Sequence, residues 1–387
     1  MTARTAVVAA SVAQKPRHGG HTWVVLQYLL GLRRIGFDVL LLDRLEPAMC
    51  RDAGGAPCRA EDSTNLHYLE SVMDSFGLGD SFALMTGESR TVAGVTRAAA
   101  AEQIRQADVL LDVMGFFRMD ELAALAPFRA FLDIDPGFPQ MWHALGLADP
   151  FAGYDAYVTI GERIGEPGCT MPTCGLDWIT TPQPVVLEEW GVVTGDDGAF
   201  TSVVTWRGAN EPVEFRGRRY GVRAHEFRRF ARLPQLVDET FELALDIHPA
   251  DTADRSLLRG TGWRLVDPVA AAGDPWRYRD FVHASKAELM VAKNMYVATN
   301  GGWVSDRTIC YLASGRPAVV QDTGIIDRYR RDAGLLTFTT VEEACAAVEA
   351  VARDHDRHAV AARTLAEECF ESDRVLRRLV SNLGLAA

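Results

Sequence analysis

The segment from residue 300 to 324, NGGWVSDRTICYLASGRPAVVQDTG, combines glycines, a potential helix cap and charged side chains. It follows the apolar run AELMVAK, and its pattern predicts a loop over 294–304, a helix from about Ser305 to Ser314, and then a strand. Ser305 can accept hydrogen bonds from the first free amides of that helix, and Gly315 suits its end. A strand, a glycine-rich loop and a helix N-terminus in this order predict an anion site.

Five residues of this region have the chemistry to bind a phosphate. Gly301 and Gly302 allow the backbone to approach a ligand closely, and the free amides near Ser305 would point at it. Arg307 and Lys293 can add positive charge against the phosphate oxygens. An ordinary tight loop of an α/β domain is the alternative interpretation, and the spacing alone does not decide between the two.

The composition of the 387 residues is that of an ordinary soluble globular protein, and the length favours two domains. The net charge of −12 argues against a nucleic-acid-binding protein, although RGRRYGVR at 216–223 is rich in arginine. No apolar run reaches about 18 residues, which predicts no membrane span. No signal-peptide pattern is present, and the seven cysteines are scattered, so we expect a cytoplasmic protein with free thiols.

Short apolar runs alternate with amphipathic segments along the whole chain. The runs expected to form strands lie at 5–13, 37–42, 108–113, 130–135, 155–160, 201–206, 242–248, 262–267, 287–293 and 317–323. This alternation predicts an α/β fold with two doubly wound, Rossmann-like sheets. A change of composition over 184–198 marks the expected connection between them. Ligands of such sheets bind at the carboxyl ends of the strands, so a cleft between two facing domains is the expected site.

Longer stretches of the sequence resemble GT-B glycosyltransferases. GGWVSDRTICYLASGRPAVV resembles their donor-binding signature, in which a Gly-Trp-x-Ser loop precedes a helix and a Gly-x-Pro strand. GWRLVDP at 262–268 looks like the loop that frames the nucleobase, and GGHTWVVLQYLLGLRRIGFDV at the front resembles the first loop and helix of a group of bacterial glycosyltransferases. The resemblance covers most of the chain.

The sequence departs from the plant small-molecule glycosyltransferases at three places. Asn300 stands where their signature has His, and Thr308 stands where their ribose-binding Glu is expected. Their final Asp-Gln pair, which reads sugar hydroxyls, is absent, with QDTG at 321–324 nearby instead. The resemblance therefore leaves the sugar and the nucleobase of the donor open.

The resemblance implies an acceptor-binding domain over 1–185, a nucleotide-sugar-binding domain over 186–370 and a C-terminal helix over 371–387 that crosses back. The implied donor-binding residues are Gly19, Gly20, Trp263, Leu265, Lys293, Gly301, Gly302, Trp303, Ser305, Asp306, Arg307, Asp322 and Thr323. The co-substrate would be a nucleoside diphosphate sugar. We expect no further cofactor and no metal, because amides, Arg and Lys can neutralise a diphosphate.

The implied catalytic residues are His21 and Asp135. In inverting GT-B enzymes a base often lies in the first loop, and an imidazole suits that task because its pKa lies near neutrality. His21 could instead only pack or cap. Asp133 and Asp135 form an Asp-x-Asp at a strand end, where a base or acceptor contact from Asp135 is favoured over a metal site. Phe138 and Trp142 could form an apolar acceptor wall, although aromatic residues at this spacing also fill cores.

The sequence thus predicts a glycosyltransferase that moves a hexosyl or deoxyhexosyl group from a nucleoside diphosphate sugar to a small-molecule acceptor, with natural products among the candidates. Two alternatives stay open. A nucleotide-sugar epimerase of the same fold would need acidic groups around the sugar and no acceptor pocket. A non-catalytic relative that stabilises another enzyme would need no base.

Overall fold

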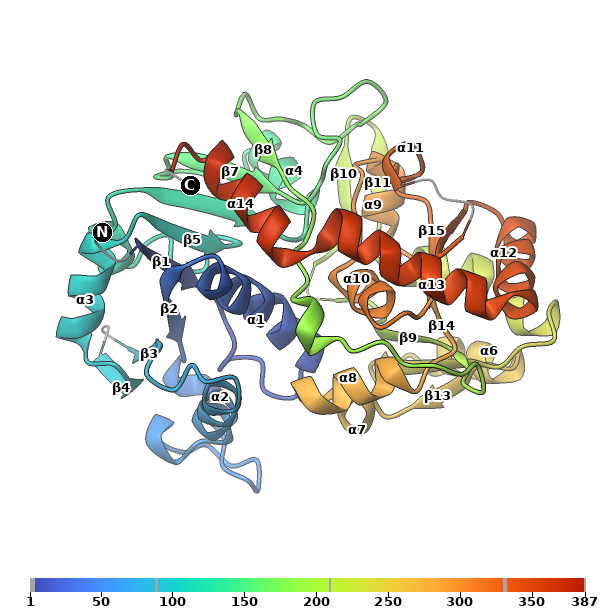
Figure 1. Cartoon of the computed structure of the whole chain (residues 1–387), viewed down its shortest axis with the longest axis horizontal. Helices are drawn as coiled ribbons and strands as arrows, with labels where there is room; N and C mark the ends of the chain where they lie inside the picture. Colours follow the sequence, from blue (N-terminus) through green and yellow to red (C-terminus); the bar gives the residue numbers. More distant parts are fainter. Residues whose placement is uncertain (1–3, 88–89, 209, 330–332, 386–387) are drawn as a thin grey trace.

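Two β-sheets lie side by side in the computed structural model, which describes residues 4–87, 90–208, 210–329 and 333–385 (Figure 1). The first sheet has the strand order β4-β3-β2-β1-β5-β6-β7-β8, and all its neighbours are parallel except β3 and β4. Its strands are β1 (Arg4–Ala9), β2 (Phe37–Arg44), β3 (Phe82–Thr86), β4 (Arg90–Gly94), β5 (Val109–Val113), β6 (Arg129–Asp133), β7 (Ala156–Thr159) and β8 (Trp178–Thr180).

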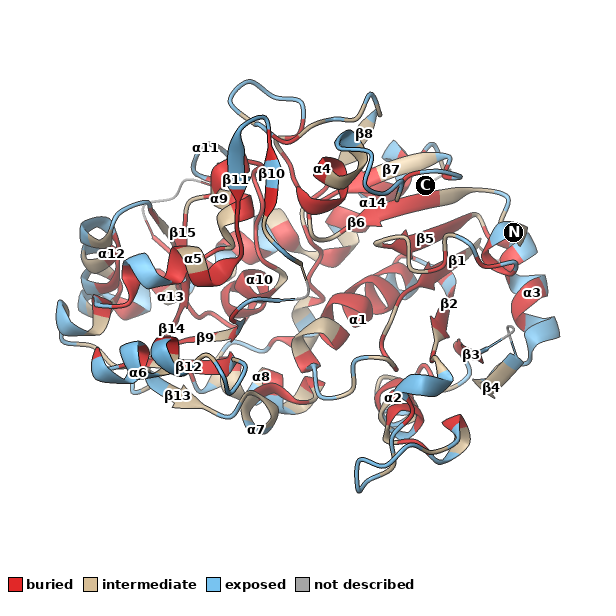
Figure 2. Ribbon diagram, turned by 180° about the vertical axis from the view of Figure 1, so that it is seen from behind, coloured by how far each residue is buried: buried red, intermediate tan, exposed pale blue. Residues whose placement is uncertain are grey.

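Helices cover both faces of this sheet because successive side chains of a strand point to opposite faces. On β1, Ala6 and Val8 pack into the core that contains α1, whereas Val7 packs into a second cluster with Ala100 and Ile104 of α3. The burial colouring in Figure 2 shows α1 almost wholly buried and α3 with an exposed outer side. The helices of this half are α1 (Gly19–Arg34), α2 (Thr64–Ser75), α3 (Arg97–Gln106) and α4 (Phe138–Ala144).

The second sheet is entirely parallel, with the order β13-β12-β9-β14-β15-β16. Its strands are β9 (Phe200–Thr205), β12 (Phe241–Asp246), β13 (Arg264–Val266), β14 (Ala287–Met290), β15 (Ala318–Gln321) and β16 (Leu335–Phe338). A separate antiparallel hairpin, β10 (Val213–Phe215) and β11 (Arg218–Tyr220), follows β9. The helices of this half are α5 (Arg223–Phe227), α6 (Thr252–Gly260), α7 (Pro268–Ala272), α8 (Pro275–His283), α9 (Asn294–Thr299), α10 (Asp306–Ala313), α11 (Ile326–Tyr329), α12 (Val341–Arg353) and α13 (His355–Leu365).

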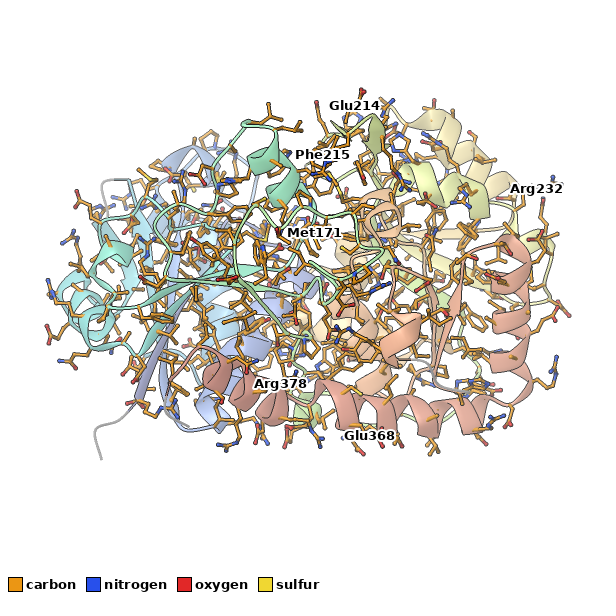
Figure 3. The ribbon with its side chains drawn as sticks, turned by 90° about the horizontal axis from the view of Figure 1, so that it is seen from above. Met171, Glu214, Phe215, Arg232, Glu368 and Arg378 are labelled. Atoms are coloured by element: carbon orange, nitrogen blue, oxygen red, sulfur yellow. The ribbon has the colours of Figure 1, made fainter. Side chains whose placement is uncertain are left out.

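The chain passes between the two halves twice, at adjacent points. The backbone N–H of Val185 donates to the carbonyl of Phe370 at 2.7 Å, and that of Ser372 donates back to Val185 at 2.9 Å. Beyond this bridge α14 (Ser372–Asn382) lies along α1 of the first half. Figure 3 shows Glu368 and Arg378 on this continuous helical edge. The predicted fold, two facing Rossmann-like sheets with a crossing C-terminal helix, is confirmed, while the domain limits at 185 and 370 stay a prediction.

One expected loop is partly helical. Residues 294–304 were expected to be irregular, but 294–299 form α9 and only the following residues form a loop. Asn294 anchors the start of α9, because its side chain accepts from the N–H of Gly221 at 2.7 Å. Asn300 ends it in the left-handed conformation with φ of 52°. A helix of six residues is too short to show a helical period in its sequence.

None of the helices described is long and apolar enough to cross a membrane.

Candidate active-site cleft

A cleft of about 670 Å³ lies between the two halves, next to the carboxyl ends of strands from both sheets. The first half lines it with Ser11, Gln14, Lys15, His21, Val24, Val113, Met114, Phe116, Ile134, Asp135, Phe138, Pro139 and Trp142. The second half lines it with residues that include Val203, Thr205, Arg207, Arg223, Lys293, Tyr296, Trp303, Ser305, Asp306 and Arg307. A neighbouring cavity of about 380 Å³ shares His21, Val203, Thr205, Asp306 and Arg307 with it. The two spaces therefore form one continuous site.

The N-terminus of α10 opens onto this site. The Ser305 hydroxyl accepts from the N–H of Arg307 at 3.2 Å, and Gly315 follows the helix with φ of 70°, so the expected cap and helix end are confirmed. The partial positive charge of a helix N-terminus favours anions. Asp306 also lines both spaces, and burial raises the pKa of its carboxyl group.

Arg307 is part of a buried ion pair. Its Nε donates to Glu288 Oε1 at 2.6 Å, and its Nη1 donates to the carbonyl of Val203 at 2.8 Å. The remaining Nη2 is buried and has no hydrogen-bond partner among the described residues. Glu288 is fully buried, so replacing Arg307 would leave an uncompensated charge inside the second half. Arg307 therefore holds the fold together as well as facing the cleft.

Arg223, the first residue of α5, is a second buried cation on the same wall. Its Nη1 donates to the carbonyl of Val291, and its Nε has no partner within the part of the chain that the structure describes. Burial, together with the nearby charge of Arg307, lowers the pKa of Arg223 to about 10, so its guanidinium remains charged at neutral pH. Sequence reasoning missed this residue because it stands in an arginine-rich run of which the other members are exposed.

His21 lies at the start of α1, with its ring between both spaces. Its Nε2 is 2.6 Å from the carbonyl oxygen of Ser11. Because a carbonyl oxygen can only accept, Nε2 carries the proton and Nδ1 keeps a lone pair. Burial, followed by the charge of Lys15, lowers the pKa of His21 to about 3, so the ring is neutral at physiological pH. His21 therefore lines both spaces as a neutral ring whose Nδ1 is the unprotonated nitrogen.

The loop between β1 and α1 is fixed by a buried carboxylate. Asp43, at the end of β2, accepts from the N–H groups of Val12 and Ala13 at 2.9 and 2.7 Å, and from the N–H of Arg44 at 2.6 Å. Burial raises the pKa of Asp43 to about 7 despite these hydrogen bonds. The loop that carries Ser11, and with it the orientation of His21, is therefore held by a neighbouring strand.

Asp135 is not free to act as a base in this structure. One carboxylate oxygen accepts from Lys293 Nζ at 2.7 Å, and the other accepts from the Tyr296 hydroxyl. Both donors belong to the second half, so this group bridges the cleft. Lys293, expected to bind phosphate, is thus already paired. Through these contacts, Asp135 of the first half is bound directly to Lys293 and Tyr296 of the second half.

The expected Asp-x-Asp motif does not form a metal site. Asp133 is fully buried, and its carboxylate accepts from Gln140 Nε2 at 2.6 Å and from the Thr159 hydroxyl at 2.8 Å. Burial raises the pKa of Asp133 to about 7. Across residues 4–87, 90–208, 210–329 and 333–385, no group of three His, Cys, Asp or Glu side chains is placed to hold a metal ion.

The four glycines expected to make room for the donor lie against the opposite half of the protein. A Cβ on Gly19 would stand 2.1 Å from the carbonyl oxygen of Asp274, and one on Gly20 would stand 2.9 Å from the ring of Tyr278. Gly301 accepts from the N–H of Arg163, and Gly302 has φ of 71° with Arg163 against its Cα. Only Gly20 lines a cavity.

Four other expected donor contacts do not line the continuous site. Trp263 is buried among Phe227 and Phe241, and its Nε1 donates to the carbonyl of Ala231. Leu265 lines a separate hollow beyond β12 and β13. These positions correct the expectation that both contact the donor in the cleft.

Asp322 and Thr323 support neighbouring backbone instead. Asp322 Oδ1 accepts from the N–H groups of Gly324 and Ile325, each at 3.0 Å. The Thr323 hydroxyl donates to the carbonyl of Trp303 at 2.6 Å, and its own carbonyl accepts from Gly302. Thr323 therefore places Trp303, which stacks on Tyr296 with ring centroids 4.0 Å apart and lines the cleft.

An apolar wall faces the cations across the cleft. Phe138 and Trp142, expected as acceptor contacts, lie with their ring centroids 5.9 Å apart on α4. Phe138 is fully buried, so its side chain does not face a ligand and that expectation is corrected, whereas Trp142 is partly exposed. Trp142 lines the space together with Val113, Met114, Phe116 and Ile134, which stand at or just after the ends of β5 and β6. The cleft thus offers cations on its second-half wall and an aromatic surface on its first-half wall.

Comparison with known proteins gives matches by structure only: no protein-family model matches the chain, and no curated protein matches it by sequence. Three solved structures that it resembles are a glycosyltransferase involved in avilamycin A biosynthesis, an α-glucosyltransferase in complex with UDP-glucose and abasic DNA, and Anabaena HepE in complex with UDP and glucose. Their identities to this chain are 15%, 10% and 10%, with TM-scores of 0.52, 0.58 and 0.56.

These likenesses extend over whole chains. Each covers 98% of this protein, and they cover 97%, 99% and 99% of the three solved chains in the same order. At such low identities the likeness concerns the arrangement of both sheets and the crossing helix, not individual side chains. The protein therefore has the GT-B fold of glycosyltransferases.

Proposed function

We propose that this protein transfers a sugar from a nucleoside diphosphate sugar to a small-molecule acceptor bound in the cleft. The observation that carries the proposal is the pair of buried arginines, Arg223 and Arg307, each with an N–H group that lacks a partner among the described residues, beside the N-terminus of α10. Unpaired buried donors of this kind are costly unless a ligand satisfies them. A diphosphate supplies the acceptor oxygens and the opposite charge.

The cleft also supports a chemical sequence for transfer with inversion. An acceptor hydroxyl would give its proton to Nδ1 of neutral His21 as its oxygen attacks the anomeric carbon. The bond from that carbon to the diphosphate would break, and the electron pair would leave with the diphosphate. Arg223, Arg307 and the amides at the start of α10 would stabilise the charge that grows there.

Two features favour a transferase with a small acceptor over the alternatives. The aromatic side chains of Phe116 and Trp142 supply an acceptor surface that an epimerase does not need. The net charge of −12 does not favour a nucleic-acid acceptor, although one of the similar structures contains DNA. The sugar and the nucleobase are not specified by these residues.

The experiment is calorimetric binding of UDP, dTDP, GDP and ADP to the wild type, Arg223→Gln and Arg232→Gln. Arg223→Gln should weaken binding by roughly 10- to 100-fold, because a hydrogen bond to a charged group contributes about 1.5–3 kcal/mol. Arg232 is exposed at the far end of the second half in Figure 3, so its variant controls for the loss of one charge. Wild-type affinity in Arg223→Gln, or no binding of any nucleotide to the wild type, would contradict the proposal.

A further inference from the structure

Among the described residues, Lys15 is the lysine that has no ion pair. The sequence has only three lysines among its 40 basic residues, and Lys286 pairs with Glu239 at 2.9 Å while Lys293 pairs with Asp135 at 2.7 Å. Lys15 lines the cleft and has no carboxylate partner among the described residues. Its ammonium group is therefore available to a ligand.

The position of Lys15 is fixed by the fold. Its backbone N–H donates to the carbonyl of Val12 at 3.0 Å, and the side chain of the preceding Gln14 donates to the carbonyl of Arg44 at 2.9 Å. Asn65 Nδ2 also binds the carbonyl of Ala13 at 2.8 Å. Together with Asp43, these contacts hold the loop on both sides. The backbone of Lys15 thus belongs to a loop that is held in place by hydrogen bonds.

The charges around Lys15 do not satisfy it. Asp135 has the largest acidic influence on the pKa of Lys15, but Lys293 and Tyr296 already occupy both oxygens of that carboxylate. Asp43 directs its carboxylate at backbone N–H groups. Lys15 is exposed to solvent, and no side chain among the described residues pairs with its ammonium group, although desolvation lowers its pKa.

The surroundings of Lys15 separate it from the proposed diphosphate site. The cations proposed for the diphosphate, Arg223 and Arg307, belong to the second half. Lys15, Phe116 and Trp142 belong to the first. A ligand held by the first half would meet an aromatic surface and a single cation. That combination suits an aromatic body that carries one negative group.

We infer that the acceptor is an aromatic or similarly apolar hydroxyl compound that carries a carboxylate, which Lys15 binds while the rest of the molecule lies on Phe116 and Trp142. This inference rests on the proposed function, because it names the acceptor class of the same cleft. The carboxylate would fix which end of the acceptor reaches His21.

The test compares 4-hydroxycinnamic acid with its methyl ester. The two compounds have the same hydroxyphenyl skeleton, but only the acid carries a negative charge. Binding is followed by calorimetry or by quenching of tryptophan fluorescence, with wild type, Lys15→Met and Arg105→Gln. Wild type should bind the acid at least about 10-fold more tightly than the ester, the effect of one charge-assisted hydrogen bond. Lys15→Met should bind both equally, with the ester affinity of the wild type. Arg105 is exposed on α3, and its variant should keep the preference.

Equal binding of acid and ester to the wild type, or a preference that survives in Lys15→Met, would overturn the inference. A loss of nucleotide affinity in Lys15→Met with the preference intact would assign Lys15 to the donor and would also overturn it. The two proposals fail separately, because the acid and ester are measured without nucleotide. A wild type that prefers the acid but binds no nucleotide would support the Lys15 site and contradict sugar transfer.

Discussion

At the scale of single residues, a backbone carbonyl does for His21 what a carboxylate does in many enzymes. The Ser11 oxygen fixes the tautomer by accepting a hydrogen bond from Nε2–H, with Nε2 and the oxygen 2.6 Å apart. It adds no full negative charge, so this hydrogen bond offsets only part of the burial effect that lowers the pKa of the ring. The result is a ring that stays neutral over the whole physiological range.

His21→Ala should lower turnover by about 10²- to 10⁴-fold, the usual effect of removing a positioned base. Nucleotide affinity should be unchanged, because the proposed diphosphate contacts lie on the other half. Rates at saturating donor and calorimetric affinities, measured on the same preparations, separate the two effects. Weaker nucleotide binding at normal turnover would make His21 a binding residue, and no change in either quantity would leave it a packing residue.

The pH profile offers a second check on His21. Its folded pKa is lowered to about 3 and the neutral ring is the active form, so protonation of His21 should not reduce the rate as the pH falls from 8 to 5. A loss of rate with an apparent pKa of 6 to 7 that disappears in His21→Ala would contradict this assignment.

At the scale of elements, most of the sheet and helix pattern could be predicted from the sequence. Buried parallel strands are continuous apolar runs, and the cap at Ser305 and the end at Gly315 have local causes. The strands β3, β4, β8 and β16 and the hairpin of β10 and β11 were not predicted. The residues of β4 and β8 are largely half-buried or exposed, so these two strands lack a continuous apolar run. α9 escaped detection because it is held by Asn294 and by packing rather than by its own period.

The glycines show why the candidate site was only partly predictable. A glycine can serve a ligand, a turn or a second chain segment that passes close by, and the sequence is the same in each case. Gly302 leaves room for Arg163, and Gly19 leaves room for the backbone of Asp274, and both neighbours lie far away in the sequence. Trp263 was equally ambiguous between a nucleobase and a core. His21, Trp142 and Ser305 line the cleft, and His21 and Ser305 stand at the starts of helices, where the sequence pattern is most informative.

Gly302→Ala should destabilise the contact between the two halves, because its Cβ would lie 2.7 Å from Arg163. Gly217→Ala is a matched control: its φ of 72° equals that of Gly302 within a degree, but no atom lies within 4 Å of the new Cβ. Both variants carry the backbone strain of about 1 kcal/mol or more that a positive φ imposes on alanine. Only Gly302→Ala adds the clash, so urea denaturation should show a clearly lower free energy of unfolding for it than for the control. Equal values for the two variants would show that the contact yields easily.

At the scale of the whole molecule, the crossing helix joins the last residues of the chain to the first helix. Leu376 of α14 is fully buried and packs so closely on α1 that a Cβ on Gly31 would stand 2.5 Å from it. α14 therefore completes the core of the first half, although it follows the second half in the sequence.

Leu376→Ala should lower the free energy of unfolding by about 2–5 kcal/mol, the range for removing a buried leucine side chain. Leu236→Ala is the control, because Leu236 is 54% exposed and the same change there should matter little. Urea denaturation followed by circular dichroism measures both. Similar values for the two variants would mean that α14 is not part of the first core.

The paired crossings at Val185 and Ser372 have a consequence for biosynthesis. The first half emerges from the ribosome with the outer side of α1 uncovered, and it stays so until the whole second half and then α14 have been made. The helix that completes its core is made only after the second half. During synthesis the first half therefore keeps the apolar side of α1 exposed until α14 can pack on it.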